Sequence, residues 1–369
     1  MKQLKTMETN TNPRTPFFTG QGDRPYWIAG PCSAETEAQV LETAHALKDS
    51  GIDLFRAGVW KPRTRPGDFE GNGTQALPWL RRVKEETGLK VCTEVANAHH
   101  AHEAMKYGVD VLWIGARSTT NPFSVQEIAD ALQGADIPVL VKNPINPDIK
   151  LWMGALERID RAGIKRLGVV HRGFSTFGKD KYRNQPRWQL AIELKRLLPD
   201  MAFICDSSHI CGSRELLYDV SQKALDLNYD GIMLEVHPRP DEAWSDSAQQ
   251  ITPEVYKEVK SRLQFRMATT DDADFLDSLE ALRGQIDEID DEILALLEAR
   301  MQLSDGIGLY KKKNNISILQ TGRWSEILDN SIAKGARKGL SAEVIAGVWK
   351  AVHQESINRQ HKGMKRKDD

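Results

Sequence analysis

The stretch YWIAGPCS, residues 26–33, decides how the N-terminal part of the chain folds. Its first five residues predict a short buried strand, which is followed at once by Pro31, Cys32 and Ser33. A dinucleotide-binding sheet has a Gly-x-Gly-x-x-Gly turn at this place, so the stretch argues against that open fold. Polar and reactive side chains directly after a buried strand are typical of enzyme barrels.

The same pattern repeats over residues 26–264, where short apolar runs alternate with stretches of helical period. The runs number about eight and are spaced close to the ~30 residues of a strand-plus-helix unit. They are YWIAG, IDLFRA, KVCTEV, DVLWIGA, PVLVK, RLGVV, AFICD and GIMLEV. We therefore predict a closed (β/α)8 TIM barrel, with an open doubly wound sheet as the alternative.

The composition is that of a globular protein. The 369 residues are 40% hydrophobic and 28% charged, and no run reaches the ~18 apolar residues of a membrane span. The N-terminus lacks the apolar core of a secretory signal, so we expect a cytoplasmic protein. A net charge of −2 argues against nucleic-acid and membrane partners, and four cysteines make no disulfide framework.

The C-terminal part predicts a different, all-α domain. A polar segment at residues 265–274 predicts a linker between the barrel, residues 1–264, and a helical domain, residues 275–369. An apolar stripe from Leu276 to Leu303 predicts one helix of nearly forty residues, followed by helices at about 322–336 and 341–361. A helix ~55–60 Å long cannot bury its stripe against two short helices, so we expect at least a dimer.

Basic side chains gather where the predicted strands end, which is the face of a barrel that carries the chemistry. They are Arg56, Lys61, Arg63, Arg65, Arg117, Lys142 and Arg172. Any one of them is as readily an ion-paired surface residue, but a whole set at successive strand ends would repel unless it held a polyanion. We infer a phosphorylated, carboxylated substrate.

Potential metal ligands occupy the same strand ends: Cys32, His209, Glu235 and, a short loop later, Asp246. Alone, such a cysteine or histidine is more often a packed core residue. Together they offer one sulfur, one nitrogen and two carboxylates, which suit Mn²⁺, Fe²⁺, Co²⁺ or Zn²⁺ better than Ca²⁺.

The strand-end motifs resemble, over the whole barrel and in family order, the type I DAHP synthases, and within them the short subgroup with a bare barrel. The motifs are IAGPCS at 28–33, FRAG at 55–58, KPRT at 61–64, GARS at 115–118, VKNP at 141–144, HRGF at 171–174, DSSH at 206–209 and EVHP at 235–238. The resemblance implies a metal-dependent condensation of phosphoenolpyruvate with erythrose 4-phosphate, the first step of the shikimate pathway.

The resemblance also implies roles for single residues. Arg56, Lys61, Arg117, Lys142 and Arg172 match phosphoenolpyruvate-binding positions, Arg63, Thr64 and Ser118 match erythrose 4-phosphate positions, and Cys32, His209, Glu235 and Asp246 match the metal ligands, with Mn²⁺ ranked first. Lys61, Lys142 and Glu94 form the candidate catalytic set. Glu94 and Lys142 are alternatives for activating the water that adds at C2, and each could equally be structural.

KDO 8-phosphate synthase, a sibling family with the same barrel and phosphoenolpyruvate chemistry, is the alternative for the substrate. That family has a Lys-Ala-Asn-Arg type segment where this chain has Lys61-Pro62-Arg63-Thr64. The segment therefore favours erythrose 4-phosphate.

The helical domain resembles the all-helical chorismate mutases, which are intertwined dimers that convert chorismate to prephenate. The matching positions are Arg283, Arg300, Lys311, Arg323 and Gln360. The resemblance implies that arginines hold the two carboxylates and that Lys311 and Gln360 donate to the ether oxygen. Helix geometry places Arg300 and Lys311 on one face, and turns Arg283 about 100° away, so Arg283 would serve the site of another chain.

Two positions depart from that family. Trp324 stands where a glutamate often contacts the substrate hydroxyl, and Gln320 replaces an aspartate of some members. The alternative is therefore a non-catalytic dimerisation and sensor module. We also expect prephenate or chorismate to inhibit the barrel by changing how the two domains meet.

Overall fold

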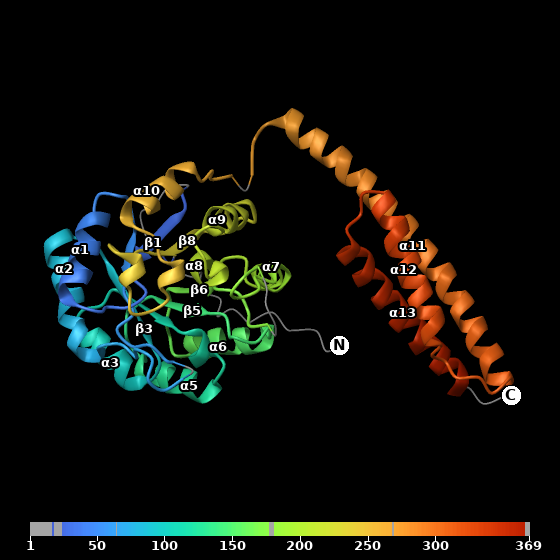
Figure 1. Cartoon of the computed structure of the whole chain (residues 1–369), viewed down its shortest axis with the longest axis horizontal. Coiled ribbons are helices and arrows are strands. Elements are labelled where there is room, and N and C mark those ends of the chain that lie inside the picture. Colours follow the sequence, from blue (N-terminus) through green and yellow to red (C-terminus); the bar gives the residue numbers. More distant parts are fainter. Residues whose placement is uncertain (1–16, 18–23, 64, 177–180, 268, 366–369) are drawn as a thin grey trace. The chain divides into compact units, whose positions relative to one another are not determined.

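The computed structural model describes residues 17, 24–63, 65–176, 181–267 and 269–365. The chain divides into two compact units, Met1–Ala268 and Thr269–Asp369. The first unit contains a barrel and the second contains long helices (Figure 1). Among the described residues, no helix has both the length and the apolar character that crossing a bilayer demands.

Parallel strands of the described chain close into a barrel in sequence order, with β8 pairing back to β1. The strands are β1 (Tyr26–Gly30), β2 (Leu54–Arg56), β3 (Val91–Val95), β4 (Val111–Ile114), β5 (Val139–Lys142), β6 (Leu167–His171), β7 (Ala202–Asp206) and β8 (Gly231–Glu235). The predicted (β/α)8 barrel is confirmed. The open-sheet alternative is wrong, because every one of these strands pairs on both sides.

Helices connect the strands and cover the barrel from outside (Figure 1). The longer ones are α1 (Glu37–Leu47), α2 (Leu77–Thr87), α3 (Ala98–Lys106), α5 (Pro122–Ala131), α6 (Ile149–Arg161), α7 (Trp188–Leu197), α9 (Leu217–Asp226) and α10 (Pro253–Arg262). Short helices follow strand ends or lie in loops: η1 (Gly73–Ala76), α4 (Ala116–Thr119), α8 (Ser207–Cys211), η2 (Pro240–Glu242) and η3 (Ser247–Gln249). Side-chain caps begin several helices, such as Thr36 on α1 and Asp148 on α6.

Two apolar clusters hold the barrel together. The larger one packs the helices onto the strands. The smaller one takes a side chain from every strand and includes Phe17: Ile28, Leu54, Cys92, Val111, Trp113, Leu140, Val170, Ile204 and Met233. At the strand ends the backbones approach closely, since a Cβ on Gly30, at φ +146°, would overlap the carbonyl oxygen of Arg56.

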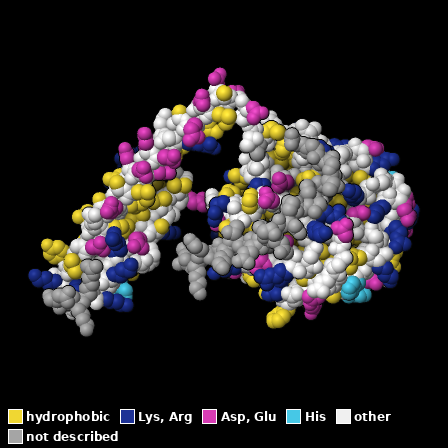
Figure 2. Space-filling model, turned by 180° about the vertical axis from the view of Figure 1, so that it is seen from behind, with side chains coloured by type: hydrophobic (Ala, Val, Ile, Leu, Met, Phe, Trp, Pro, Cys, Tyr) yellow, Lys and Arg dark blue, Asp and Glu magenta, His cyan; other side chains and the backbone are white. Residues whose placement is uncertain are grey.

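The C-terminal unit consists of α11 (Ala273–Lys313), α12 (Thr321–Arg337) and α13 (Ala342–Lys365), as the stripe and its two following segments predict. Helix α13 packs against both α11 and α12. The apolar stripe of α11 stays largely exposed, with Ile289 at 55% and Leu296 at 71%. Figure 2 shows hydrophobic side chains in a band along these helices.

His171 is a fully buried histidine whose two ring nitrogens are both hydrogen-bonded. Its Nδ1 accepts from the Tyr229 hydroxyl at 2.9 Å, and its Nε2 donates to the Pro186 carbonyl at 2.6 Å. Burial lowers the pKa of His171 to about 4 from its ordinary 6.5. The ring is therefore neutral in the folded barrel at neutral pH.

Acidification should therefore destabilise the barrel through His171. Its folded pKa lies below its unfolded pKa, so stability present above pH 6.5 is lost as the pH falls towards 4. By pH 4.5 the loss is about 2–3 kcal/mol of unfolding free energy. Urea unfolding followed by tryptophan fluorescence at pH 7 and 4.5 measures it, with His171→Gln as the neutral control. If the wild type and His171→Gln lost the same unfolding free energy between pH 7 and 4.5, the lowered pKa assigned to His171 would be contradicted.

Candidate active sites

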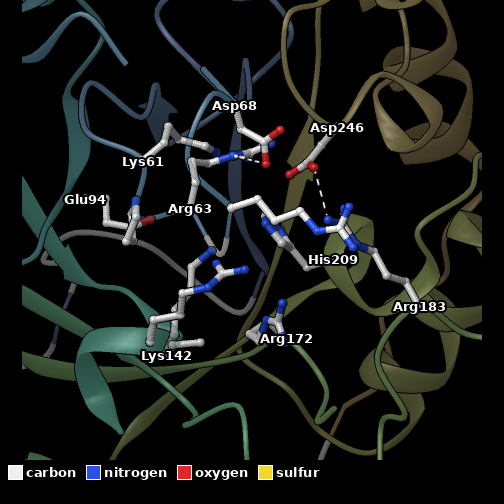
Figure 3. A pocket seen from close by; sticks show the side chains of 13 residues that line it. Lys61, Arg63, Asp68, Glu94, Lys142, Arg172, Arg183, His209 and Asp246 are labelled. Carbon is white, nitrogen blue, oxygen red and sulfur yellow. Dashed lines mark hydrogen bonds and ion pairs between the residues drawn. The ribbon is translucent and has the colours of Figure 1, made fainter. Parts of the chain in front are cut away.

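A cavity of about 260 Å³ lies at the carboxyl ends of the strands (Figure 3). Seven cationic side chains and three carboxylates line it: Lys61, Arg63, Arg65, Arg117, Lys142, Arg172 and Arg183 with Asp68, Glu94 and Asp246. His209 and Pro62 complete much of the wall. An excess of four positive charges in so small a space favours a ligand with several negative charges.

Two of the cationic side chains, Lys142 and Arg172, contact buried polar partners. The Lys142 ammonium lies 2.7 Å from an oxygen of Asp206, and both side chains are buried. Arg172 donates to the side-chain oxygen of Asn184 at 2.7 Å. Burial lowers the pKa of Arg172 to about 10, so it is still a cation at neutral pH. These contacts orient the charges before any ligand arrives.

Arg56, at the end of β2, is buried and is not among the residues that line the cavity. Its guanidinium lies 2.9 Å from Glu235 Oε1 and 5.1 Å from the centre of the Trp113 ring. In this position Arg56 supports a predicted metal ligand instead of reaching into the open space.

Three of the four predicted metal ligands come together beside the cavity. Ligand atoms of Cys32, Glu235 and Asp246 all lie within 4.8 Å of one another. Glu235 Oε1 is buried and forms an ion pair with Arg56 at 2.9 Å, but it makes no hydrogen bond of good geometry within the described chain. The set combines a soft sulfur with two hard carboxylates, which fits a divalent transition metal.

His209, the fourth predicted ligand, lies next to this group. Its Nδ1 contacts Asp206 at 2.9 Å and lies 3.8 Å from Glu235 Oε1. A carboxylate on one ring nitrogen is the usual support of a metal-binding histidine, and it leaves Nε2 for the metal. Asp206 thus supports His209 and Lys142 together.

Both anionic and cationic groups border this cluster. Burial, together with neighbouring Glu235, raises the pKa of Cys32 to about 12, so the free group is a thiol. Burial would also raise the pKa of Asp246, but Lys61 and Arg183 lower it well below its ordinary value. The Lys61 ammonium lies 2.8 Å from Cys32 Sγ and gives the cluster a positive neighbour.

Glu94 reaches the cavity from β3 because Gly115 leaves space for it. A Cβ on Gly115 would lie 2.0 Å from Glu94 Oε1. The other carboxylate oxygen accepts a hydrogen bond from Trp113 Nε1 at 3.0 Å. Gly115 is therefore required by the close approach of this side chain.

The structure adds residues that the sequence analysis missed. Arg183 lies in the connection between β6 and α7 and bonds Asp246 at 3.1 Å and Gln249 at 2.7 Å. The sequence signal that could have pointed to Arg183 is the length of this connection at the active face of the barrel. Asp206 is inside a quoted motif, but its buried role was not foreseen. Ser118 is buried on α4 and does not line the cavity, and Thr64 lies outside the described residues.

In the helical unit, part of the predicted chorismate set comes together. Arg300 of α11 donates to Ser356 Oγ of α13 at 2.6 Å. Gln360, one turn further along α13, is buried, and its Oε1 has no hydrogen-bond partner in the described chain. Gly308 allows this approach, since a Cβ there would lie 2.9 Å from Gln360 Cα. Ser356 was not foreseen.

The other predicted positions are spread along the helices. Lys311 donates to the Ile318 carbonyl, and Arg323 pairs with Glu326 at 2.8 Å. Arg283 is exposed and lies 3.8 Å from Glu280.

Comparison with known proteins accounts for both units. Residues 5–269 match the DAHP synthetase I family. The chain belongs to the DAHP synthetase I family. Residues 282–361 match chorismate mutase type II. The chain thus carries DAHP synthase activity in its barrel, followed by a chorismate mutase domain, and is a bifunctional enzyme of the shikimate pathway.

The similar proteins include aldolases with two different names. The chain is 32% identical over 237 residues to a phospho-2-dehydro-3-deoxyheptonate aldolase of Thermotoga maritima, covering 64% of this chain and 68% of the relative. The crystal structure of such an enzyme from that organism superposes with a TM-score of 0.57 at 30% identity, covering 64% of this chain and 67% of the other. A 2-dehydro-3-deoxyphosphooctonate aldolase of Vesicomyosocius okutanii is 26% identical, over 74% of this chain and 99% of its own.

Proposed function

We propose that the cationic cavity binds phosphoenolpyruvate and erythrose 4-phosphate beside a divalent metal. The excess of positive charge next to the Cys32, Glu235 and Asp246 cluster carries this proposal. Lys61, Arg117, Lys142 and Arg172 take the carboxylate and phosphate of phosphoenolpyruvate, and Arg56 acts through Glu235. Arg63, which lines the cavity, takes the phosphate of erythrose 4-phosphate. Ser118 and Thr64 are the further positions that the family resemblance implies for this phosphate.

Cys32, His209, Glu235 and Asp246 would hold the metal, with Mn²⁺ ranked first and Fe²⁺, Co²⁺ or Zn²⁺ as alternatives. When bound, it supplies Lewis-acid polarisation of the aldehyde oxygen. The cations hold C3 of phosphoenolpyruvate against the aldehyde carbon, where the new C–C bond forms. Water then adds at C2, and phosphate leaves as its bond from oxygen to C2 breaks.

Glu94 is the better candidate for accepting the proton of that water. It lines the cavity as a carboxylate, while Trp113 holds only one of its oxygens. The Lys142 ammonium is paired with Asp206, so it is suited to donating and to binding anions.

Synthase assays on the purified chain test the barrel. After chelation and return of Mn²⁺, phosphoenolpyruvate should be consumed with erythrose 4-phosphate but not with arabinose 5-phosphate. In Cys32→Ala we expect turnover to fall at least about a hundredfold and calorimetric Mn²⁺ affinity by at least about tenfold, because one ligand is missing. Cys92→Ala, which removes an equally buried thiol outside the cluster, is the control.

Consumption with arabinose 5-phosphate alone would overturn the erythrose 4-phosphate assignment in favour of KDO 8-phosphate synthesis. Unchanged Mn²⁺ affinity in Cys32→Ala would overturn the ligand assignment.

We further propose that a second copy of the chain covers the exposed stripe of α11. Leu282, Ile286, Ile289, Ile293 and Leu296 are each about half exposed or more, which is costly for isolated apolar side chains in water. Arg283 is next to Leu282 in the sequence. In the proposed dimer, Arg283 of the second copy would join four residues of the first copy around chorismate: Arg300, Lys311, Arg323 and Gln360. Arginines then hold the two carboxylates, while Lys311 and Gln360 donate to the ether oxygen, where charge develops.

Sedimentation of the full chain should show a dimer or a higher oligomer. Ile293→Arg places a charge within the stripe and should shift the population towards monomer by at least about tenfold in dissociation constant. Asp291→Arg introduces the same side chain on the opposite side of α11 and should have little effect. Monomeric wild-type protein at micromolar concentration would contradict the proposed dimer.

We propose that prephenate, made by the helical unit, inhibits the barrel. Binding at one site changes the activity of another only if the two sites share a conformational equilibrium. Saturating prephenate should lower the synthase rate several-fold, and Arg300→Ala should remove the effect, because the carboxylates of prephenate are then no longer held. The initial rate of phosphoenolpyruvate loss measures it. Equal rates with and without prephenate would refute this regulation.

A further inference from the structure

Trp324 and His353 form an aromatic stack within the mutase unit. Their ring centroids are 3.9 Å apart, and their planes differ by 14°. Trp324 belongs to α12, directly after Arg323, while His353 belongs to α13. Both residues are half-buried. A nearly parallel stack on a large indole holds an imidazole in one orientation.

His353 occupies the face of α13 that also carries Ser356 and Gln360. Spacings of three and seven residues put the three side chains on one side of the helix. Ser356 accepts the hydrogen bond from Arg300, and Gln360 is buried with an unpartnered oxygen. His353 is therefore in line with residues proposed to hold chorismate.

His353 lies in positively charged surroundings. Burial, with the positive charges of Arg300 and Lys311, lowers the pKa of His353 below its ordinary value. At neutral pH its ring therefore has one N–H donor and one nitrogen acceptor. Among the described residues neither ring nitrogen is hydrogen-bonded, so both are available to a ligand.

The chemistry of chorismate leaves one group for such a partner. Chorismate has two carboxylates, an ether oxygen and a hydroxyl. The arginines are assigned to the carboxylates, and Lys311 and Gln360 to the ether oxygen. A hydroxyl both donates and accepts, so a neutral imidazole matches it, whereas a lysine or an arginine can only donate.

We propose that His353, held in place by Trp324, hydrogen-bonds the hydroxyl group of chorismate and makes the mutase site selective for it. The proposal rests on the proposed function of the helical unit. Trp324 is a positioning residue, and His353 is a substrate-contacting residue. Together they supply a polar contact without adding a negative charge beside the dianion.

The test compares chorismate with an analogue in which hydrogen replaces the hydroxyl group. In the full-length chain, His353→Ala should lower kcat/KM for chorismate about ten- to a hundredfold and leave kcat/KM for the analogue unchanged. His353→Asn, which keeps a donor and an acceptor, should recover part of the loss. Trp324→Ala should also reduce the preference for chorismate over the analogue. Trp324→Phe should reduce it less, because the phenyl ring can still stack on His353. His361→Ala, an exposed histidine of the same helix, is the control.

Equal losses on both substrates, or no loss on either, would overturn the role of His353. A wild-type chain that binds chorismate without converting it would instead contradict the mutase activity. In that case calorimetry measures the dissociation constants of chorismate and of the analogue. The wild type should bind chorismate more tightly than the analogue, and His353→Ala should bind the two equally. A wild-type chain with no preference, or with no binding of either compound, would refute the inference.

Discussion

The barrel site depends on the contacts of one buried carboxylate, that of Asp206. It contacts Lys142 at 2.7 Å and His209 at 2.9 Å, and the guanidinium of Arg56 lies 3.9 Å away. Burial alone would raise the pKa of Asp206, but His209, Lys142 and Arg56 lower it well below its ordinary value. The group is thus a permanent anion at the centre of a cationic site, and it joins the anion-binding side to the metal-binding side.

That arrangement explains how so many cations are tolerated in one cavity. Buried positive charges without partners would destabilise the fold, and each partner here also fixes a direction. Within the cavity, Lys142 is directed by Asp206 and Arg183 by Asp246, while Arg56, outside the lining, is directed by Glu235. The remaining excess of positive charge faces the open space, where substrate phosphates and carboxylates would complete the balance.

The helical unit follows a different principle. Its sequence has a strong apolar stripe, yet the three described helices leave much of it exposed. Contacts across helices bring Arg300 to Ser356 and Trp324 to His353. The departure from the mutase pattern at Trp324 is therefore matched by a partner on another helix, which the sequence comparison by itself did not reveal.

The amino-acid sequence by itself determined the order of strands and helices and the long helix, because periodicity is a local property. It left a closed barrel and an open sheet as alternatives, and the pairing of β8 with β1 decided between them. The sequence also determined that Cys32, Glu235 and Asp246 follow strand ends or their loops. Only the tertiary structure decided that Arg56 pairs with Glu235 outside the cavity lining, that Arg183 lines the cavity, that Asp206 contacts both Lys142 and His209, and that Trp324 stacks on His353. These contacts join residues far apart in the chain, and they exist only once the barrel has closed and the helices have packed.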